Sequence, residues 1–318
     1  MIFRSPTRLL AAGIVLAGGF AFGGPAFAAC PDRAAVLSRL LGGQDIAAAE
    51  RAVDEIAAAR ECTPAERRMA RRALAERLMA EARRLQESPS DAGRAEAMIE
   101  KAAALRAFWA AAMADGDLKL KRRAFAPAAL AYQQAIDMIA ADAADAGRLD
   151  VPRATLARLA ARADEARHLA ASGPGGQLVV VAQDRNGQMG GVFSQVLNRG
   201  AEAVRIPVPI LFVYNSDEFT PVGREAATEF ARLLQERQPG VVSVTGHTDR
   251  VGGDEFNQAL SLRRARRVAE FLRASGFAGE IRVAGKGKTE PRQLSDATSY
   301  DQAQIDELNR RVEFDWKS

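Results

Sequence analysis

The chain changes character once, near residue 174, and this change sets what it can fold into. Residues 31–171 are rich in Ala, Arg, Glu and Leu and have almost no runs of β-branched residues, a composition that favours helix. Apolar residues recur there at helical spacing, as at Ala70, Leu74, Leu78, Ala82 and Leu85. After residue 176, short β-rich runs alternate with helical segments, which is typical of a sheet covered by helices. The sequence therefore predicts an all-α domain over 29–172 followed by an α+β domain over 207–318.

The helical half contains clear helix-breaking residues. Apolar periodicity and these breaks together predict about five or six helices, packed as antiparallel hairpins. Proline in the first turn marks helix starts at Thr63-Pro64 and Val151-Pro152. The breaks are expected at Gly42-Gly43, Cys62-Thr63-Pro64, Ser88-Pro89-Ser90, Gly116 and Val151-Pro152.

One hairpin of this half resembles a tetratricopeptide repeat. The matching small and aromatic positions are Gly116, Phe125, Ala128, Tyr132 and Ala135. Small residues at these positions let two helices approach closely. No clean second copy follows at a period of about 34 residues, so a plain Ala-rich bundle is the alternative. Both interpretations imply protein contact or spacing.

The second half begins with a Gly/Pro joint at residues 173–176, inside a strand-containing linker over 173–206. A strand is predicted at Gln177–Gln183 and a loop at Gly187–Gly191. Further strands are predicted at Ile210–Tyr214, Val241–Thr245, Ile281–Ala284 and Arg311–Trp316. Helices are predicted from a Thr220-Pro221 cap to about Gln235, over Asp254–Ala274 with Gly276 closing it, and around Asp301–Leu308. We expect the two long helices to cover one face of one sheet.

The first 28 residues have the pattern of a secretory signal. Arg4 and Arg8 are followed by an apolar stretch, Leu9–Phe22, and by the small-x-small pattern of residues 26–28. The apolar stretch is short for a membrane span, which needs roughly 20 residues, and an uncleaved anchor is the alternative. No later stretch is long and apolar enough to span a membrane, so we expect an exported protein.

Both cysteines, Cys30 and Cys62, follow the expected cleavage site. Two cysteines in an oxidising compartment predict a disulfide between them. Lipidation of Cys30 is the alternative, although Phe27 stands where a lipoprotein signal usually has a leucine-like residue.

Charge and residue content argue against several functions. The 44 basic and 40 acidic residues are interspersed and the net charge is only +4, which gives no support to nucleic-acid binding. Two distant histidines and two paired cysteines supply no zinc ligand set, and no cofactor is expected. His247, Asp249 and Ser261 do not form a nucleophile–base line at a strand end, and His168 is expected at the surface. Catalysis is therefore not expected.

The helix at Asp254–Ala274 has an unusual buried face. Leu260, Val268, Phe271 and Leu272 form an apolar arc, and Asn257 and Arg264 fall inside it. A guanidinium there is costly without a fixed partner. The preceding strand leads into residues 246–249, so the Asp249 carboxylate and the Arg264 guanidinium should converge at one loop.

This convergence has two interpretations. Asp249 and Arg264 could form an internal ion pair that holds the loop in place. The surrounding Gly246, Gly252 and Gly253 instead allow a ligand to approach the backbone closely. A carboxylate beside a guanidinium then suits a ligand that carries both an ammonium and a carboxylate.

The motif T-D-x-x-G from Thr248, then Asn257, then L-S-x-x-R-A from Leu260 resembles the OmpA-like peptidoglycan-binding domain. The resemblance covers Ile210–Trp316, and several ordered landmarks make it specific. The further landmarks are residues 212–217 (FVYNSD), 284–287 (AGKG) and 309–313 (NRRVE).

The resemblance implies non-covalent binding of peptidoglycan, with Asp249 taking the ammonium and Arg264 the carboxylate of a diaminopimelate residue in the stem peptide. A planar guanidinium holds a carboxylate through two parallel bonds. Thr248 and Asn257 match positions that shape the pocket. Arg310 either approaches the same pocket or braces the sheet.

The same resemblance implies a periplasmic, cell-wall-associated protein, with outer-membrane association as a further expectation, that anchors a helical interaction domain. In the alternative, the protein is a helical scaffold whose last domain is only an attachment. A motor stator is not expected, because its membrane helix before the domain is missing from this sequence.

Overall fold

The structure is a computed structural model that describes residues 30–173, 175–176, 178–179 and 206–317. The chain divides into two compact units between Ala70 and Arg71, and each is described by itself. Within the described ranges, none of the helices qualifies as a membrane span. The predicted signal at residues 1–28 and the loop at Gly187–Gly191 lie outside the described residues. The predicted divisions at residues 28, 172 and 206 stay predictions.

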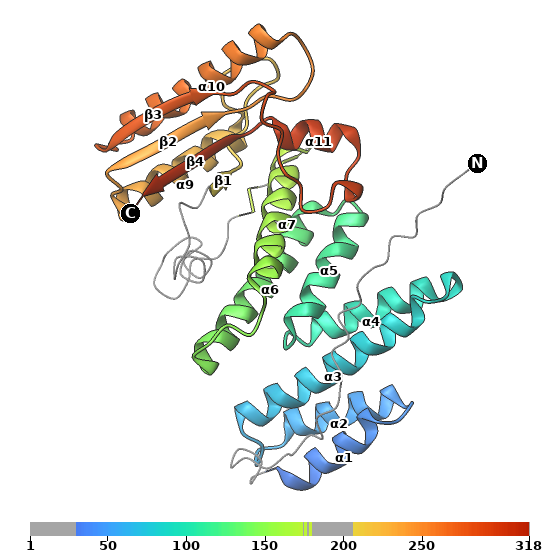
Figure 1. Ribbon diagram of the computed structural model, residues 1–318. Helices are drawn as coiled ribbons and strands as arrows, with labels where there is room; N and C mark the ends of the chain where they lie inside the picture. The colour runs from blue at the N-terminus through green and yellow to red at the C-terminus, as the bar shows by residue number, and fades with distance from the viewer. Residues whose placement is uncertain (1–29, 174, 177, 180–205, 318) are drawn as a thin grey trace, which may run out of the picture. The chain divides into compact units, whose positions relative to one another are not determined.

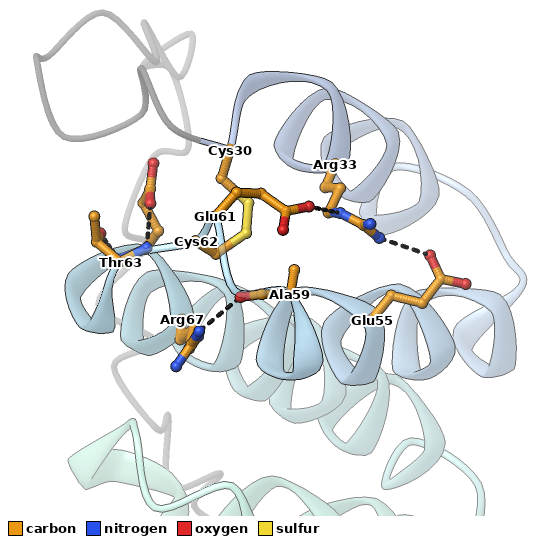
Figure 2. Close-up of a disulfide and its surroundings, with 9 residues drawn as sticks. Cys30, Arg33, Glu55, Ala59, Glu61, Cys62, Thr63 and Arg67 are labelled. Atoms are coloured by element: carbon orange, nitrogen blue, oxygen red, sulfur yellow. Dashed lines mark hydrogen bonds and ion pairs between the residues drawn. A yellow bond between two sulfur atoms is a disulfide. The ribbon is translucent and has the colours of Figure 1, made fainter.

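The first unit contains α1 (Pro31–Leu41), α2 (Ile46–Ala58) and the start of α3 (Pro64–Leu85). A disulfide joins Cys30 to Cys62, whose Cα atoms lie 5.0 Å apart, and so ties the start of α1 to the start of α3 (Figure 2). This confirms the predicted pairing over the lipidated alternative, which needs a free Cys30 sulfur. Thr63 caps α3, because its Oγ1 accepts from the Glu66 amide at 3.2 Å while its own amide donates to the Glu66 carboxylate at 2.6 Å.

The helical region has more helices than predicted. Residues 30–173 contain seven α-helices, α1 to α7, where five or six were expected. The prediction missed the turns before and after α5, in which Arg106 (φ 49°) and Arg123 (φ 58°) adopt left-handed conformations without glycine or proline. The elements after α3 are a 3-10 turn η2 (Pro89–Asp91), α4 (Ala92–Ala104), α5 (Trp109–Lys121), α6 (Phe125–Ala146) and α7 (Arg153–Ser172).

The predicted break at Gly116 is wrong. Gly116 lies inside α5, against Tyr132 of α6. A Cβ at Gly116 would sit 2.5 Å from Cε1 of the Tyr132 ring, so only glycine allows this approach of the two helices. Tyr132 is fully buried and its hydroxyl donates to Oδ1 of Asp117 at 2.7 Å. The close packing of the α5–α6 hairpin is as expected, while its relation to a repeat family stays a prediction.

The C-terminal part forms a four-stranded mixed sheet in the order β1-β4-β2-β3 (Figure 1). β2 and β3 are parallel, and β4 runs antiparallel to both β1 and β2. The strands are β1 (Ile206–Val208), β2 (Val241–Gly246), β3 (Glu280–Gly285) and β4 (Val312–Lys317).

Two helices, α9 (Pro221–Arg237) and α10 (Asp254–Ala274), cover one face of this sheet. Alternate strand residues such as Val242, Val244 and Phe314 share a core with Phe230 of α9 and Val268 of α10, as the strand period of two requires. The predicted α+β class with two helices on one sheet face is therefore confirmed. Thr220 caps α9 through a bond from the Gly223 amide at 3.0 Å.

The predicted strand at Ile210–Tyr214 is wrong, because the strand lies earlier in the chain, at Ile206–Val208. The strand beside β4 at one edge of the sheet is β1, and Ile210–Tyr214 forms only an isolated bridge, between Phe212 and Phe219. The Ile210 amide bonds back to the Val208 carbonyl at 2.7 Å, a tight turn at Pro209 that takes the chain off the sheet. Of the predicted strand at Gln177–Gln183, Leu178 and Val179 are described and are not in a strand; the rest lies outside the described residues.

The segment between β3 and β4 packs on the helical region. It contains η3 (Ala297–Ser299) and α11 (Gln302–Asn309), and α11 lies beside α7 (Figure 1). Tyr300 and Leu308 share a core with Leu159 and Leu169 of α7. We call this contact of residues 291–309 with α7 the α7–α11 junction.

Two polar residues of α7 are buried in the junction. Glu165 accepts three hydrogen bonds, from the Ser295 amide at 2.9 Å, the Ser295 hydroxyl at 2.5 Å and the Tyr300 hydroxyl at 2.7 Å. His168 is only 4% exposed, and its Nε2 lies 3.0 Å from the carbonyl oxygen of Glu307. The prediction that His168 lies at the surface is therefore wrong, because α11 covers it.

Candidate ligand site at the end of β2

The candidate site forms where β2 ends and the loop 247–253 leads into α10. Gly246 is required there, because a Cβ would come within 2.1 Å of the Ser261 carbonyl oxygen on α10. Gly252 has a φ of 93°, a conformation that side chains disfavour. Both glycines shape the loop by allowing close approach and a left-handed turn.

Asp249 is only 8% exposed, and both of its carboxylate oxygens have partners. Oδ1 accepts from the Val251 amide at 2.9 Å, which folds the loop back on itself. Oδ2 accepts from Nη1 of Arg310 at 2.6 Å. The guanidinium that pairs with Asp249 therefore comes from the end of α11 and not from α10.

Arg264 is only 3% exposed and is held by backbone and ring contacts. Nε donates to the Ser216 carbonyl at 2.9 Å and Nη2 to the Val213 carbonyl at 3.5 Å. The guanidinium carbon lies 5.1 Å from the centre of the Phe212 ring, within the range of a cation–π contact. The internal ion pair between Asp249 and Arg264 is therefore wrong as an account of how Arg264 is accommodated.

The charges of Asp249 and Arg310 nevertheless act on Arg264. Burial, and then the positive charge of Arg310, lower the pKa of Arg264 to about 10, while the negative charge of Asp249 opposes this shift. Arg264 stays protonated at neutral pH. It is a buried cation that is influenced by the charge of Asp249, and Arg310 already contacts that carboxylate.

Arg310 is half-buried and lies between two carboxylates. It contacts Asp249 and also donates from Nη2 to Glu307, three residues earlier on α11. Burial works against ionisation of Glu307, but contacts with His168 and Arg310 lower its pKa to about 2. Arg310 therefore contacts Asp249, and its part in ligand binding stays a prediction.

Thr248 and Asn257 hold the loop through backbone contacts. The Thr248 amide donates to the Gly287 carbonyl at 2.9 Å, and its hydroxyl donates to the Asp249 carbonyl at 3.0 Å. Asn257 donates from Nδ2 to the Val251 carbonyl at 2.9 Å. Both side chains are buried, and their hydrogen bonds fix the shape of the loop. Contacts of these side chains with a ligand stay a prediction.

Sequence reasoning missed the groups that hold the two arginines. The carbonyls of Val213 and Ser216 carry no side-chain signal, so no motif could reveal them. Glu307 did carry one, since it stands three residues before Arg310 on a predicted helix, where opposite charges meet.

Exposed apolar side chains occur on the same loops as the site. Val213 and Tyr214 belong to the turn that binds Arg264, while Val251 belongs to the loop after β2 and Phe256 to the first turn of α10. Tyr214 is 75% exposed. Exposed apolar side chains close in sequence to buried polar groups are common at ligand sites.

His247, Asp249 and Ser261 make no contact that would link them as a nucleophile and base. His247 is buried and its Nε2 lies 3.5 Å from Glu313. The Ser261 hydroxyl donates to the Gln258 carbonyl and accepts from the Gly287 amide, both at 2.9 Å. Among the described residues, no group of three or more His, Cys, Asp or Glu side chains is arranged to hold a metal ion.

Comparison with known sequences identifies this region. The OmpA family model matches residues 211–304. Outer membrane protein A of Shimwellia blattae is 37% identical over 34% of this chain and 48% of its own length. Outer membrane protein A of Escherichia coli O157:H7 is 36% identical over 34% of this chain and 33% of its own length. The match therefore spans about half or less of these relatives.

Solved structures are similar over the same share of the chain. The cell wall anchor of the T6SS from Pseudomonas aeruginosa is 30% identical, with 36% of this chain and 80% of that chain covered and a TM-score of 0.29. The peptidoglycan-associated lipoprotein from Burkholderia pseudomallei is 23% identical, with 36% and 89% covered and a TM-score of 0.29. With the family match and the identity to the curated relatives, the conclusion is that the C-terminal third of this chain contains an OmpA family domain at residues 211–304.

Proposed function

We propose that the C-terminal domain binds bacterial peptidoglycan non-covalently at the site of Asp249 and Arg264. One observation carries the proposal. A carboxylate and a guanidinium, both more than nine-tenths buried, belong to the same site without forming an ion pair with each other. Two buried opposite charges that do not pair suit a ligand that bears both charges itself.

The chemistry of each group assigns its role. Asp249 takes the ligand's ammonium, and Arg264 takes its carboxylate. Among the described residues, Arg264 donates from Nε and Nη2, and no hydrogen bond is made by Nη1. A guanidinium with an open donor can bind a carboxylate by a charge-assisted bond, and lysine cannot reproduce its planar geometry.

The ligand proposed is the diaminopimelate residue of the stem peptide, which carries an ammonium and a carboxylate on one carbon at the end of its side chain. The spacing of Thr248, Asp249, Asn257 and Arg264 and the family match support this choice. Thr248 and Asn257 shape the loop, and Arg310 orients the Asp249 carboxylate. The domain would thereby anchor the helical region to the cell wall in the periplasm of the envelope, with outer-membrane association as a further expectation.

Co-sedimentation with insoluble peptidoglycan tests this function. We expect Asp249→Ala and Arg264→Ala each to weaken binding about tenfold to a hundredfold, because each removes a charge-assisted bond of roughly 1.5–3 kcal/mol. Arg264→Lys should also weaken binding, since it keeps the charge and loses the planar donors. Circular dichroism would verify that each variant is folded.

Two controls sharpen the test. Glu229→Gln breaks an exposed ion pair with Arg232 on α9 and should bind like wild type. Peptidoglycan whose diaminopimelate carboxylate is amidated should bind wild type more weakly and Arg264→Ala no differently. Unchanged binding by both alanine variants would refute the proposal and leave the domain as a structural attachment for a helical scaffold.

A further inference from the structure

The candidate site extends beyond the matched residues 211–304, because Arg310, which contacts Asp249, follows them in the chain. Arg310 also has a second carboxylate partner. Arg310 contacts Asp249 from Nη1 at 2.6 Å and Glu307 from Nη2. Asp249 is therefore neutralised only in part, since one guanidinium serves two carboxylates. Glu307 has no predicted or assigned role in ligand binding.

Helix α7 of the helical region fixes the position of Glu307. Nε2 of His168 lies 3.0 Å from the Glu307 carbonyl oxygen and 3.7 Å from its carboxylate. Leu308, the next residue, is fully buried in the core that includes Leu159 and Leu169 of α7. The segment before α11 is fixed in the same way, through the three bonds to Glu165. The backbone that carries Glu307 and Arg310 is thus held from α7.

The sharing has an energetic consequence for a ligand. An ammonium that approaches Asp249 meets a carboxylate already bonded to Arg310 and must share it or displace the guanidinium. A half-buried guanidinium left without an anion is costly. Glu307 removes that cost, because Arg310 keeps one carboxylate partner whether or not Asp249 is taken.

We propose that Glu307 is a positioning residue of the ligand site, and that α7 supports the site through His168. Glu307 holds Arg310 so that Asp249 remains available to the ammonium of the ligand. The helical region is then a structural part of the binding site as well as the part that it anchors. This inference rests on the proposed function.

The first test measures binding to insoluble peptidoglycan by Glu307→Gln. The substitution keeps the backbone carbonyl that contacts His168 and removes only the charge. We expect affinity to fall about threefold to tenfold, the size of coupling usual between neighbouring residues of one network. Glu229→Gln is the matched control, because Glu229 also pairs with an arginine three residues later in a helix, and it should bind like wild type.

The second test shows whether Glu307 acts through Arg310. In an Arg310→Gln background, Glu307→Gln should cause no further loss, because the shared cation is absent. A loss of the same size in both backgrounds would mean that Glu307 acts independently of Arg310, and would overturn the inference.

The third test addresses α7. His168→Leu, which cannot bond to the Glu307 carbonyl, should weaken binding in the same direction, and His168→Gln, which retains a donor, should recover part of it. If Glu307→Gln does not fold, this pair decides the question: equal binding by His168→Leu and wild type overturns the support from α7.

The outcomes separate this inference from the function on which it rests. Wild-type binding by Glu307→Gln and His168→Leu, with binding lost in Asp249→Ala and Arg264→Ala, would overturn the inference alone. Binding that survives in Asp249→Ala and Arg264→Ala would overturn the proposed function and the inference together.

Discussion

Glu165 at the α7–α11 junction and Arg264 at the end of β2 are both buried charges, but their surroundings differ. Glu165 is 0% exposed and its carboxylate accepts three hydrogen bonds from the segment that covers it. Arg264 is 3% exposed and has two carbonyls and an aromatic ring as recorded neighbours. The first charge has its partners within the protein, whereas the second forms no ion pair with a carboxylate in the described part of the chain.

The difference distinguishes a structural charge from one available to a ligand. A buried charge whose hydrogen bonds are complete holds two segments together, and its removal leaves several donors unsatisfied. A buried charge without a counter-ion costs stability. Such a charge is expected where it binds a ligand. The predictions below separate the two cases, from the largest expected effect on stability to the smallest.

Removal of the Glu165 carboxylate should have the largest effect. Glu165→Leu leaves the Ser295 amide and the hydroxyls of Ser295 and Tyr300 without their acceptor, so we expect a loss of about 3 kcal/mol or more in the free energy of unfolding. Urea denaturation would measure it. Glu165→Gln keeps an acceptor oxygen and should lose less. An equal or smaller loss in Glu165→Leu than in Glu165→Gln would show that the junction is not held by these bonds.

A second change perturbs the packing of α5 on α6 without touching a charge. Gly116→Ala places a methyl group 2.5 Å from the Tyr132 ring, and Tyr132 shares Asp117 with Arg162 of α7. Overpacking of this kind costs about 1–3 kcal/mol, measurable as a lower unfolding midpoint in urea. Gly93→Ala in α4 is the matched control, because its Cβ would meet nothing within 4 Å, and it should be neutral or stabilising. Equal stability of the two variants would contradict the packing described.

The junction should also lose stability in mild acid. Burial lowers the pKa of His168 below its ordinary value of 6.5, with Arg292 acting in the same direction and Glu307 opposing it. The unfolded chain therefore binds a proton near pH 6.5 that the folded protein does not yet bind. This contribution is complete above pH 6.5 and is lost as the pH falls toward the folded pKa, by up to about 1.4 kcal/mol per pH unit.

Unfolding free energies measured at several pH values below 6.5 would test this, with His168→Gln as the comparison. The variant should lose less stability than wild type over the same range. Identical slopes would mean that His168 titrates alike in both states.

Arg264→Met should change stability least. Methionine has a similar length and removes a buried charge that forms no ion pair with a carboxylate among the described residues, while two carbonyls lose a donor. We therefore expect a change in stability within about 1 kcal/mol, together with loss of peptidoglycan binding. Arg263→Met, at an exposed neighbouring position of α10, should change neither property. A large destabilisation by Arg264→Met would make this arginine a structural charge like Glu165 and remove the contrast between the two regions.

Much of the C-terminal fold follows from local signals. The bounds of α10, the Thr220 cap of α9 and the three strands β2, β3 and β4 depend on periodicity and capping within a few residues, and each was predicted to within about two residues. Where those signals are absent the prediction was wrong. Arg106 and Arg123 take left-handed conformations without glycine, and the turn at Pro209 ends β1 before the apolar stretch that was taken for the strand.

The sequence indicated which residues lie near the candidate site but not which charged side chains contact each other. The motif places Thr248, Asp249, Asn257 and Arg264 around one loop and leaves Arg310 open between this loop and the sheet, and the structure puts Arg310 in contact with Asp249. The roles of these residues in ligand binding stay a prediction. The motif did not show that Arg310, rather than Arg264, contacts Asp249, because that choice depends on where the end of α11 lies. The burial of His168 was missed for the same reason, since its partner Glu307 is 139 residues away in the chain.

The sequence by itself determined the two compositional halves, the sheet with two helices and the presence of a guanidinium on an apolar helix face. These features arise from the period of each segment and from charges that must be accounted for wherever they lie. Only the tertiary structure decided which charges meet. Hydrogen bonds and ion pairs act over a few ångströms, so packing of α11 between α7 and the loop after β2 places Arg310 beside Asp249 and leaves Arg264 to backbone carbonyls.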